Sequence, residues 1–148
     1  MVHRYEHFSS SISGIYRCIQ KIEADEMEKH GLRGSHAQYL AALRRFEKGL
    51  TVSQLSEMCM KDKAAVSRAV AEMEQKGLIV RETAGDNLYR AAIVLTDRGR
   101  EIAEYVARRA TSAVEHVGIS EPDIEKFYAV LDLISTNLRE VCKKGLPE

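Results

Sequence analysis

The stretch that decides the fold is TVSQLSEMCMKDKAAVSRAVAEMEQKGLIVRE, residues 51–82. Apolar residues recur at helical spacing in its first part, a break follows at 59–61, and a second helical pattern occupies 63–76. Thr51 and Asp62 carry the short polar side chains that cap helix N-termini, and Gly77 suits the position just after a helix. The stretch therefore predicts a short helix, a tight turn and a longer helix.

A β-hairpin is expected directly after these two helices. LIVRET (78–83) and YRAAIVL (89–95) are rich in β-branched residues, and they flank the turn-forming AGDN (84–87). Two helices joined by a tight turn and followed by a hairpin form a winged helix-turn-helix arrangement. The sequence thus predicts a mainly α fold with a small β-hairpin wing, in which the second helix faces the DNA major groove.

The predicted recognition helix, 63–76, has a row of side chains suited to DNA. An inner stripe at Val66, Val70 and Met73 turns short and hydrophilic residues outward. Arg68 suits a guanine edge or a phosphate, and nearby lysines suit phosphates. Together with the arginines at the base of the wing, the predicted DNA-binding residues are Lys61, Lys63, Ala64, Ala65, Ser67, Arg68, Arg81 and Arg90.

Amphipathic helices are expected on both sides of this head. The pattern predicts helices over 5–29 and 120–144, with Ser120 at the cap and Pro122 in the first turn of the second. Ser35 is expected to cap a helix that buries Tyr39, Leu40, Leu43 and Phe46. Thr96 is expected to cap a helix that runs to about residue 118.

Composition excludes several classes of protein. The 148 residues carry no net charge, with 22 basic and 22 acidic side chains, so DNA binding requires the basic groups to gather on one face. No apolar run approaches a membrane span and no secretion signal begins the chain, so we expect a cytoplasmic protein without a membrane partner. Three scattered cysteines form no disulfide framework.

Catalytic and metal-binding signatures are not found in the sequence. There is no phosphate loop, nucleophile elbow or HExxH, so we expect a protein that is not an enzyme and needs no cofactor. Only His3 and His7 share a helical i, i+4 spacing, and a solvated histidine is the simpler interpretation of both. We expect no metal site.

The sequence resembles the MarR family of bacterial transcriptional regulators. LSEMCMKDKAAVSRAVAEMEQKGLIVRE (55–82) contains an Asp-Lys before the recognition helix, Val-Ser-Arg within it and EQKGLI leading into the wing. IVLTDRGREI (93–102) then provides a Leu-Thr that leads to Gly99. The order and spacing of these elements extend over essentially the whole chain, and the resemblance implies a regulator that binds double-stranded DNA.

This chain departs from the family pattern at two places. Where the family commonly has Ser-Thr at the start of the recognition helix, this chain has Ala64 and Ala65, so base reading there can rest on methyl contacts with thymine. The family's wing Asp-x-Arg falls on Asn87 and Tyr89, with Arg90 one residue late. Because adjacent strand residues face opposite sides, Arg90 is expected on the face opposite to that of the family's arginine, unless a shifted turn compensates.

The resemblance implies a homodimer formed by the first and last helices, 1–34 and 118–148, around a head at 35–100 and a connecting helix at 97–118 in one domain. The apolar stripes at both ends agree, because they exceed what a small core can cover; packing within one chain is the alternative. The expected interface residues are Ile12, Phe127, Tyr128, Leu131, Ile134 and Leu138.

Family members respond to small ligands, so the resemblance implies a small apolar or phenolic effector and occlusion of a promoter that the effector relieves. Tyr16, His36 and Tyr39 are the candidate lining residues, with core packing as the alternative for each. Redox sensing through Cys18 in the first helix is a second candidate switch. The rival function from another class is a protein-binding adaptor built on a winged-helix scaffold.

Overall fold

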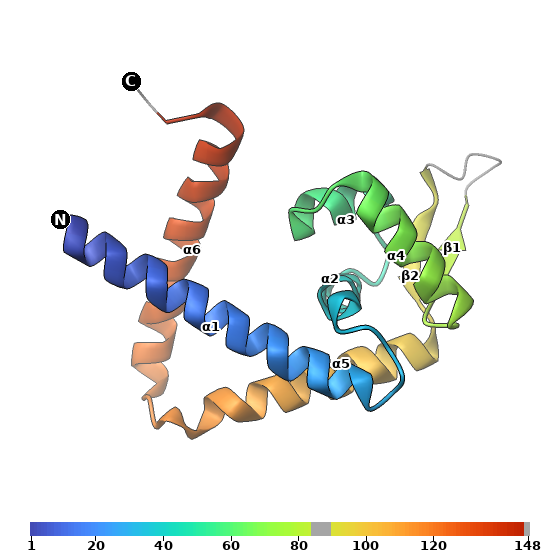
Figure 1. Cartoon of the computed structure of the whole chain (residues 1–148), viewed down its shortest axis with the longest axis horizontal. Coiled ribbons are helices and arrows are strands. Elements are labelled where there is room, and N and C mark those ends of the chain that lie inside the picture. Colours follow the sequence, from blue (N-terminus) through green and yellow to red (C-terminus); the bar gives the residue numbers. More distant parts are fainter. Residues whose placement is uncertain (84–89, 147–148) are drawn as a thin grey trace. The chain divides into compact units, whose positions relative to one another are not determined.

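The computed structural model describes residues 1–83 and 90–146, which divide into two compact units, Met1–Ala113 and Val114–Glu148 (Figure 1). The first unit contains the helix-turn-helix and its hairpin. In chain order its elements are α1 (Val2–Glu28), the 3-10 turn η1 (Gly34–His36), α2 (Ala37–Arg45), α3 (Val52–Cys59), α4 (Lys63–Gln75), β1 (Ile79–Glu82), β2 (Ala92–Leu95) and α5 (Asp97–Val114). The second unit contains the 3-10 turn η3 (Glu115–Val117) and α6 (Glu121–Lys144).

Both predicted caps of the helix-turn-helix are confirmed. The backbone N–H of Gln54 donates to Thr51 Oγ1 at 3.2 Å, and the Gln54 side chain accepts from the Thr51 N–H at 2.8 Å, which completes a capping box. Asp62 Oδ1 accepts the Ala65 N–H at 2.8 Å. Each cap stabilises its helix by about 1 kcal/mol, so the local sequence alone defines where α3 and α4 begin.

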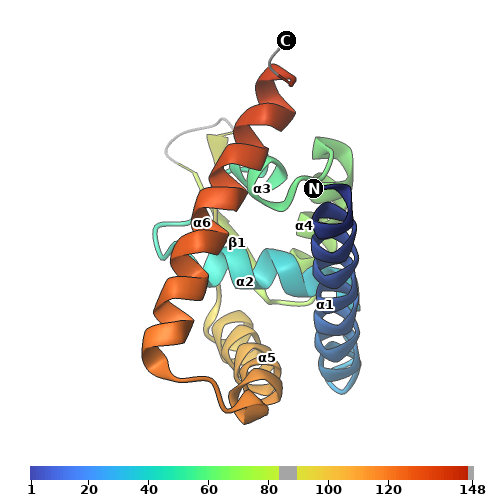
Figure 2. The same ribbon diagram turned by 90° about the vertical axis from the view of Figure 1, so that its left-hand side faces the viewer.

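The core of the first unit joins the inner faces of α2, α3 and α4. Figure 2 shows α2 crossing the middle of this unit, with α3 above it and α5 below. The predicted inner stripe of α4 is confirmed, and the side chains that are almost completely enclosed include Leu40, Leu43, Leu55, Val66, Val70 and Met73. Burial of each contributes about 1.5–3 kcal/mol, which holds the two helices of the head at a fixed angle.

The predicted hairpin is confirmed, and a short segment before α3 extends it. β1 and β2 pair antiparallel, with Ile79 opposite Leu95. Leu50 bridges to Ile93 through two backbone hydrogen bonds of 3.1 and 2.8 Å, an interaction that the sequence reading did not anticipate. The expected AGDN turn and the register positions Asn87 and Tyr89 lie outside the described residues.

Two expectations about α2 are wrong. Residues 34–36 form a 3-10 turn, so α2 begins at Ala37 and the Ser35 side chain caps nothing. Phe46 lies just past the end of α2 with a backbone (φ −127°, ψ 85°) that leaves the helical path. Its side chain consequently leaves the inner face of α2 and is 40% exposed.

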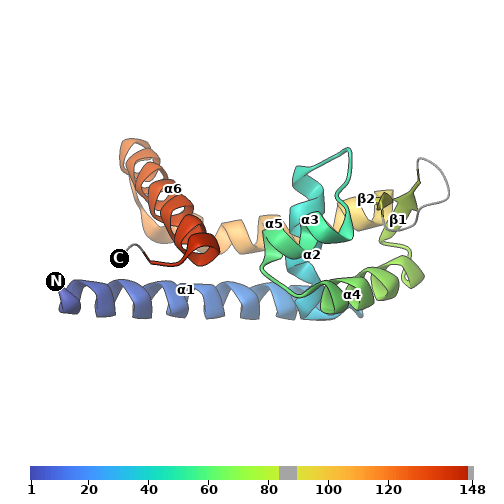
Figure 3. The ribbon, with the colours of Figure 1, turned by 90° about the horizontal axis from the view of Figure 1, so that it is seen from above.

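α1 is a single long helix that is buried only near its C-terminal end. Figure 3 shows its first half running clear of α2, α3 and α4. Its buried residues are Glu26 and Met27, and the apolar side chains of its first two thirds are exposed or half-buried. The predicted helix over 5–29 is confirmed, and only its last turns belong to the core.

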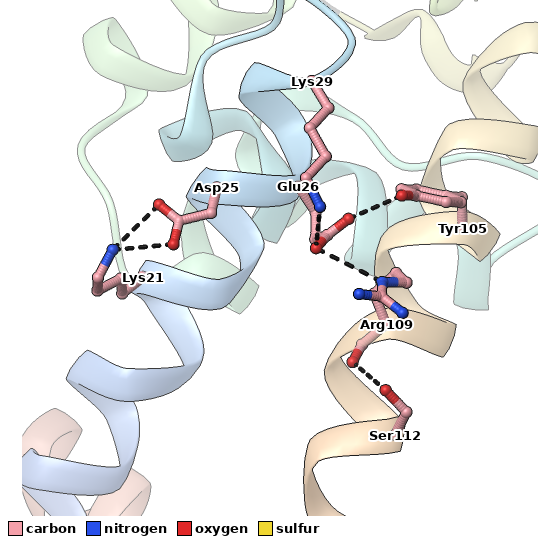
Figure 4. A network of polar contacts seen from close by, with 7 residues as sticks. All are labelled: Lys21, Asp25, Glu26, Lys29, Tyr105, Arg109 and Ser112. Carbon is pink, nitrogen blue, oxygen red and sulfur yellow. Dashed lines mark hydrogen bonds and ion pairs between the residues drawn. The ribbon is translucent and has the colours of Figure 1, made fainter.

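A buried carboxylate joins α1 to α5 (Figure 4). Glu26 Oε2 accepts from the Tyr105 hydroxyl at 2.8 Å, and Oε1 accepts from Lys29 Nζ at 2.7 Å and lies 3.5 Å from Arg109 Nε. The bonds from Lys29 and Tyr105 lower the pKa of Glu26 to about 2. α1 is therefore fixed to α5 by a charged group that is fully hydrogen-bonded.

The junction between the hairpin and α5 depends on Thr96 and Gly99. The Thr96 hydroxyl accepts the Gly99 N–H at 3.0 Å, which confirms the predicted cap, and it donates to the Gly77 carbonyl at 2.7 Å. The Thr96 N–H donates to the Leu78 carbonyl at 3.0 Å. α5 approaches so closely that a Cβ on Gly99 would lie 1.9 Å from the Leu78 oxygen. Only glycine fits at this position.

In the second unit, none of the residues of α6 is buried. α6 has Ser120 at its N-terminal boundary and Pro122 in its first turn, as predicted, but the Ser120 hydroxyl donates to the Asp123 carboxylate at 2.6 Å rather than accepting a backbone N–H. Phe127, Tyr128 and Leu138 are at least half exposed. Within the part of the chain that the structure describes, no helix is long and apolar enough to span a membrane.

Gly99→Ala should be severely destabilising because the added methyl group collides with backbone at Leu78. We expect the free energy of unfolding to fall by about 3 kcal/mol or more, measured by urea denaturation. Gly14→Ala is the matched control: its Cβ meets nothing within 4 Å inside α1, and it should stabilise the helix by up to about 1 kcal/mol. Equal effects of the two substitutions would contradict the close approach at Gly99.

Glu26→Gln should remove an acid-sensitive part of the stability. The folded pKa of about 2 lies below the usual 4.5, so the stabilisation is complete above pH 4.5 and is lost as the pH falls towards 2. The variant should be less stable than the wild type at pH 7, and the difference should narrow between pH 4.5 and 2. Thermal unfolding across this range measures it. The control is Glu28→Gln, on the exposed side of α1. If the difference in stability between Glu26→Gln and the wild type does not change with pH, the low pKa of Glu26 is refuted.

Candidate nucleic-acid interface

The outer face of α4 presents the row of residues that the sequence predicted. Lys63, Ala64, Ser67 and Arg68 are exposed, and Ala65 is half-buried next to the inner stripe. The row combines a hydroxyl and a guanidinium with methyl groups small enough for the helix backbone to approach a groove closely. The inner face of α4 is thus apolar and buried, and its outer face carries exposed polar and small side chains, as a helix that contacts DNA requires.

The N-terminal half of α4 carries cations that the rest of the described chain leaves unpaired. Among the described residues, the side chains of Lys61, Lys63 and Arg68 make no hydrogen bond or ion pair. Asp62, which lies between the two lysines in the sequence, caps the helix by accepting the Ala65 N–H. This end of α4 is therefore locally basic although the chain as a whole is neutral.

The C-terminal half of α4 has the opposite character, since its charges are used within the protein. Glu72 Oε2 lies 3.2 Å from Arg33 Nε and 3.5 Å from His36 Nε2, both in the segment between α1 and α2. Lys76 Nζ donates to the carbonyl of Gly31 at 2.9 Å. These contacts attach the far end of α4 to the end of α1. The sequence reading missed them because they join residues tens of positions apart.

The two arginines predicted near the wing lie in different surroundings. Arg81 on β1 is three-quarters buried, and its Nε lies 3.2 Å from Glu74 Oε2 of α4, so it fastens the hairpin to the recognition helix. Arg90 is exposed two residues before the first residue of β2. Of the pair, only Arg90 has its side chain on the surface.

The candidate effector residues do not form one enclosed site within the described single chain. His36 and Tyr39 are buried in the first unit, whereas Tyr16 is 51% exposed on α1 and accepts a hydrogen bond from Gln20. Burial lowers the pKa of His36 and raises that of Tyr39. The Nδ1 atom of His36 is buried without a hydrogen-bond partner among the described residues, which is unusual for a polar atom.

The three cysteines differ in exposure. Cys18 and Cys142 are exposed, and Cys59 is half-buried beside the Gln38 carbonyl, where burial raises the pKa of its thiol. Cys18 therefore lies on the surface of α1 rather than under its apolar side chains. In the described ranges, no three His, Cys, Asp or Glu side chains lie close enough together to hold a metal ion.

Comparison with known proteins agrees with this geometry. Residues 30–87, which include α2, α3, α4 and β1, match the sequence model of the MarR family. Among the curated proteins, none matches the chain. Several solved structures do share its fold along most of their length.

One is a MarR-family transcriptional regulator from Listeria monocytogenes, crystallised with 26-mer DNA: TM-score 0.80, 22% identity, 94% of this chain and 95% of that chain covered. Another is MarR from Staphylococcus aureus in complex with salicylate and kanamycin: TM-score 0.78, 20% identity, 93% and 94% covered. A third is CouR from Rhodococcus jostii RHA1 bound to p-coumaroyl-CoA: TM-score 0.70, 18% identity, 86% and 90% covered. The winged helix-turn-helix head of this chain thus matches the sequence model of the MarR family over residues 30–87, and the chain shares its fold with these solved structures.

Proposed function

We propose that this protein is a sequence-specific DNA-binding regulator, a homodimeric repressor that recognises a pseudo-palindromic operator and responds to a small effector. The observation that carries the proposal is the set of unpaired cations at Lys61, Lys63 and Arg68 around the N-terminal half of α4. Three unpaired cations gathered around the N-terminal end of one exposed helix can bind an anion that approaches there. The phosphate backbone of DNA is such an anion.

Each residue of this row has a task that follows from its chemistry. Arg68 pairs with a guanine edge or a phosphate, Ser67 donates a hydrogen bond, and the methyl groups of Ala64 and Ala65 contact thymine methyls. Lys61 and Lys63 bind phosphates beside the groove. Because Asp62 caps the helix N-terminus with its own carboxylate, the lysines rather than the free N–H groups supply the attraction for phosphate.

The wing has a divided role in this proposal. Arg81 is engaged with Glu74 and braces the hairpin against α4, so its contribution to DNA binding is through position. Arg90, exposed before β2, is the residue able to reach a phosphate next to the hairpin. The two arginines should therefore differ when they are mutated. The contribution of Arg90 to DNA binding should weaken more with increasing salt than the contribution of Arg81.

The apolar surface on the terminal helices supports a homodimer. α6 buries none of its residues within the chain, although its stripe includes Phe127, Tyr128, Leu131, Ile134 and Leu138. Ile12, Ile15 and Ile19 are likewise exposed on α1. Monomeric proteins seldom leave this many large apolar side chains of a helix in water, and a second copy would cover them. Dimerisation would place two recognition helices roughly 34 Å apart, one turn of DNA.

The region of His36 and Tyr39 is where we expect a small apolar or phenolic effector to bind. Structural relatives were crystallised with salicylate and with p-coumaroyl-CoA, both of which contain an aromatic ring and oxygen acceptors or donors. The unpartnered Nδ1 of His36 is a group that such a ligand could satisfy, with Tyr16 contributed across the dimer. The ligand would relieve repression only if it bound more tightly to a dimer whose two heads are wrongly spaced for DNA than to the dimer that binds DNA.

Arg68→Ala should weaken binding of the purified protein to its own upstream DNA by roughly 10- to 100-fold, because one groove contact is lost. Binding measured over a range of salt concentrations separates the two roles of Arg68. An unchanged salt slope indicates base reading, and a slope smaller by about one charge indicates a phosphate contact.

Arg108→Ala is the matched control, since it removes the same charge from an exposed position on α5. It should leave the affinity within about twofold of the wild type. If the folded wild-type dimer binds no DNA selectively at low salt, the regulator proposal fails. A protein-binding adaptor then becomes the function to test, by a search for protein partners.

Replacing Phe127 and Leu138 together by aspartate should break the dimer, because two charges would be buried in an apolar interface. We expect dimerisation to weaken by roughly a hundredfold or more, measured by sedimentation equilibrium, and operator binding to be lost with it. Thr136→Asp, exposed on the other side of α6, is the control. A double variant that remains dimeric would show that α6 is not the interface.

A further inference from the structure

Three helices of this protein end in the same backbone motif. In the Schellman motif, the residue after the helix adopts a left-handed conformation and two backbone N–H groups bond back to the last turn. At the end of α1, the N–H groups of Gly31 and Leu32 donate to Glu28 and Met27. At the end of α4, Gly77 and Leu78 donate to Glu74 and Met73. At the end of α3, Met60 and Lys61 donate to Glu57 and Ser56 in the same pattern.

The residue in the left-handed position differs at only one of these three ends. Gly31 has φ 68° and Gly77 has φ 69°, as expected for a residue without a Cβ. Met60 occupies the same position with φ 51°. An L-residue pays a steric cost there that glycine avoids. Within the described residues, Met60 is the one non-glycine with a positive φ.

Packing within the protein does not compensate for this cost. The Met60 side chain is 69% exposed, so it contributes little to the core. At the other two ends the motif is closed by a buried leucine, Leu32 or Leu78, whereas at α3 the corresponding residue is the exposed Lys61. The Ser56 hydroxyl, which donates to the Lys61 carbonyl at 2.5 Å, holds this turn closed instead. The Ser56 hydroxyl thus stabilises the turn, and the Met60 side chain remains exposed to solvent.

The place of Met60 indicates what its side chain contacts. The turn joins α3 to α4 (Figure 1), and Met60 precedes the unpaired Lys61 and Lys63 and the N-terminus of the reading helix. An exposed apolar side chain next to these cations has no apolar partner among the described residues. In a complex with DNA, the same side chain would lie at the edge of the groove that α4 enters.

We infer that Met60 is a specificity-determining residue that contacts a thymine methyl at the edge of the half-site, an inference that rests on the proposed DNA binding. Methionine is unbranched and flexible, so its terminal thioether and methyl group can adapt to the groove wall. The thymine methyl is the one apolar group that the major groove offers. A glycine at this position would relieve the backbone strain and remove the contact.

The test uses full-length variants and duplexes selected from a randomised pool by the wild-type protein. Met60→Gly removes both the side chain and the strain, and Met60→Gln keeps the strain but replaces the apolar end with an amide. Gly31→Met is the matched control, because it places methionine in the same motif at the end of α1. Replacing each thymine of the selected half-site by deoxyuridine removes only the methyl group. Thermal unfolding and binding affinity are measured for every variant.

If Met60 reads thymine, Met60→Gly should unfold at a temperature higher by about 3–6 °C but bind the selected site about tenfold more weakly. Met60→Gln should bind weakly without that gain in stability. One deoxyuridine substitution should weaken the wild type and have no further effect on either variant. Gly31→Met should lose stability and keep the wild-type site preference.

The inference is overturned if Met60→Gly binds as tightly as the wild type with the same response to every deoxyuridine. Arg68→Ala, tested on the same duplexes, separates this result from failure of the proposed function. If the wild type selects sites and Arg68→Ala loses them while Met60→Gly does not, DNA binding stands and the role of Met60 falls. If the wild type selects no site, both fall.

Discussion

The head of this protein depends on Thr96, whose hydroxyl and backbone N–H together join the first turn of α5 to the end of α4 and the start of the hairpin. The hydroxyl accepts from Gly99 in the first turn of α5 and donates to the Gly77 carbonyl at the end of α4. The neighbouring Thr96 N–H bonds Leu78 at the start of the hairpin. Because α5 can come this close only where Gly99 has no side chain, the recognition helix, the wing and α5 are fixed relative to one another at a single point. With its first turn fixed in this way, α5 also contacts α1, where the Tyr105 hydroxyl donates to Glu26.

Fixing α4 at its C-terminal end explains why its two halves differ so sharply. The half near Glu72 and Lys76 is bound to the segment between α1 and α2, and its charges are neutralised there. The half near Lys63 and Arg68 is supported only by its apolar inner face and by the Asp62 cap, so its outer side chains remain available. The division resolves the apparent conflict between zero net charge and a DNA-reading helix, since neutrality is an average over separated regions.

Local chemistry made most of the fold predictable. Caps such as Thr51 and Asp62 and the apolar spacing of α4 act over a few residues, and each was confirmed. The errors lie where tertiary structure overrides local preference: Ser35 falls in a 3-10 turn, and Phe46 lies beyond the last turn of α2. Interactions such as that between His36 and Glu72 join distant positions, and a single sequence holds no periodicity that reveals them.

The contacts of Gly31 and Arg33 with α4 attach the end of α1 to the recognition helix. Lys76 Nζ donates to the Gly31 carbonyl and Glu72 pairs with Arg33, so the segment that follows α1 is attached to the far end of the reading helix. α1 has 27 residues and at about 1.5 Å per residue is an arm of roughly 40 Å. A rotation of such an arm by about 5° about its attachment would displace its free end by roughly 3.5 Å, so the length of α1 makes the position of its N-terminus sensitive to a small change of angle at that attachment.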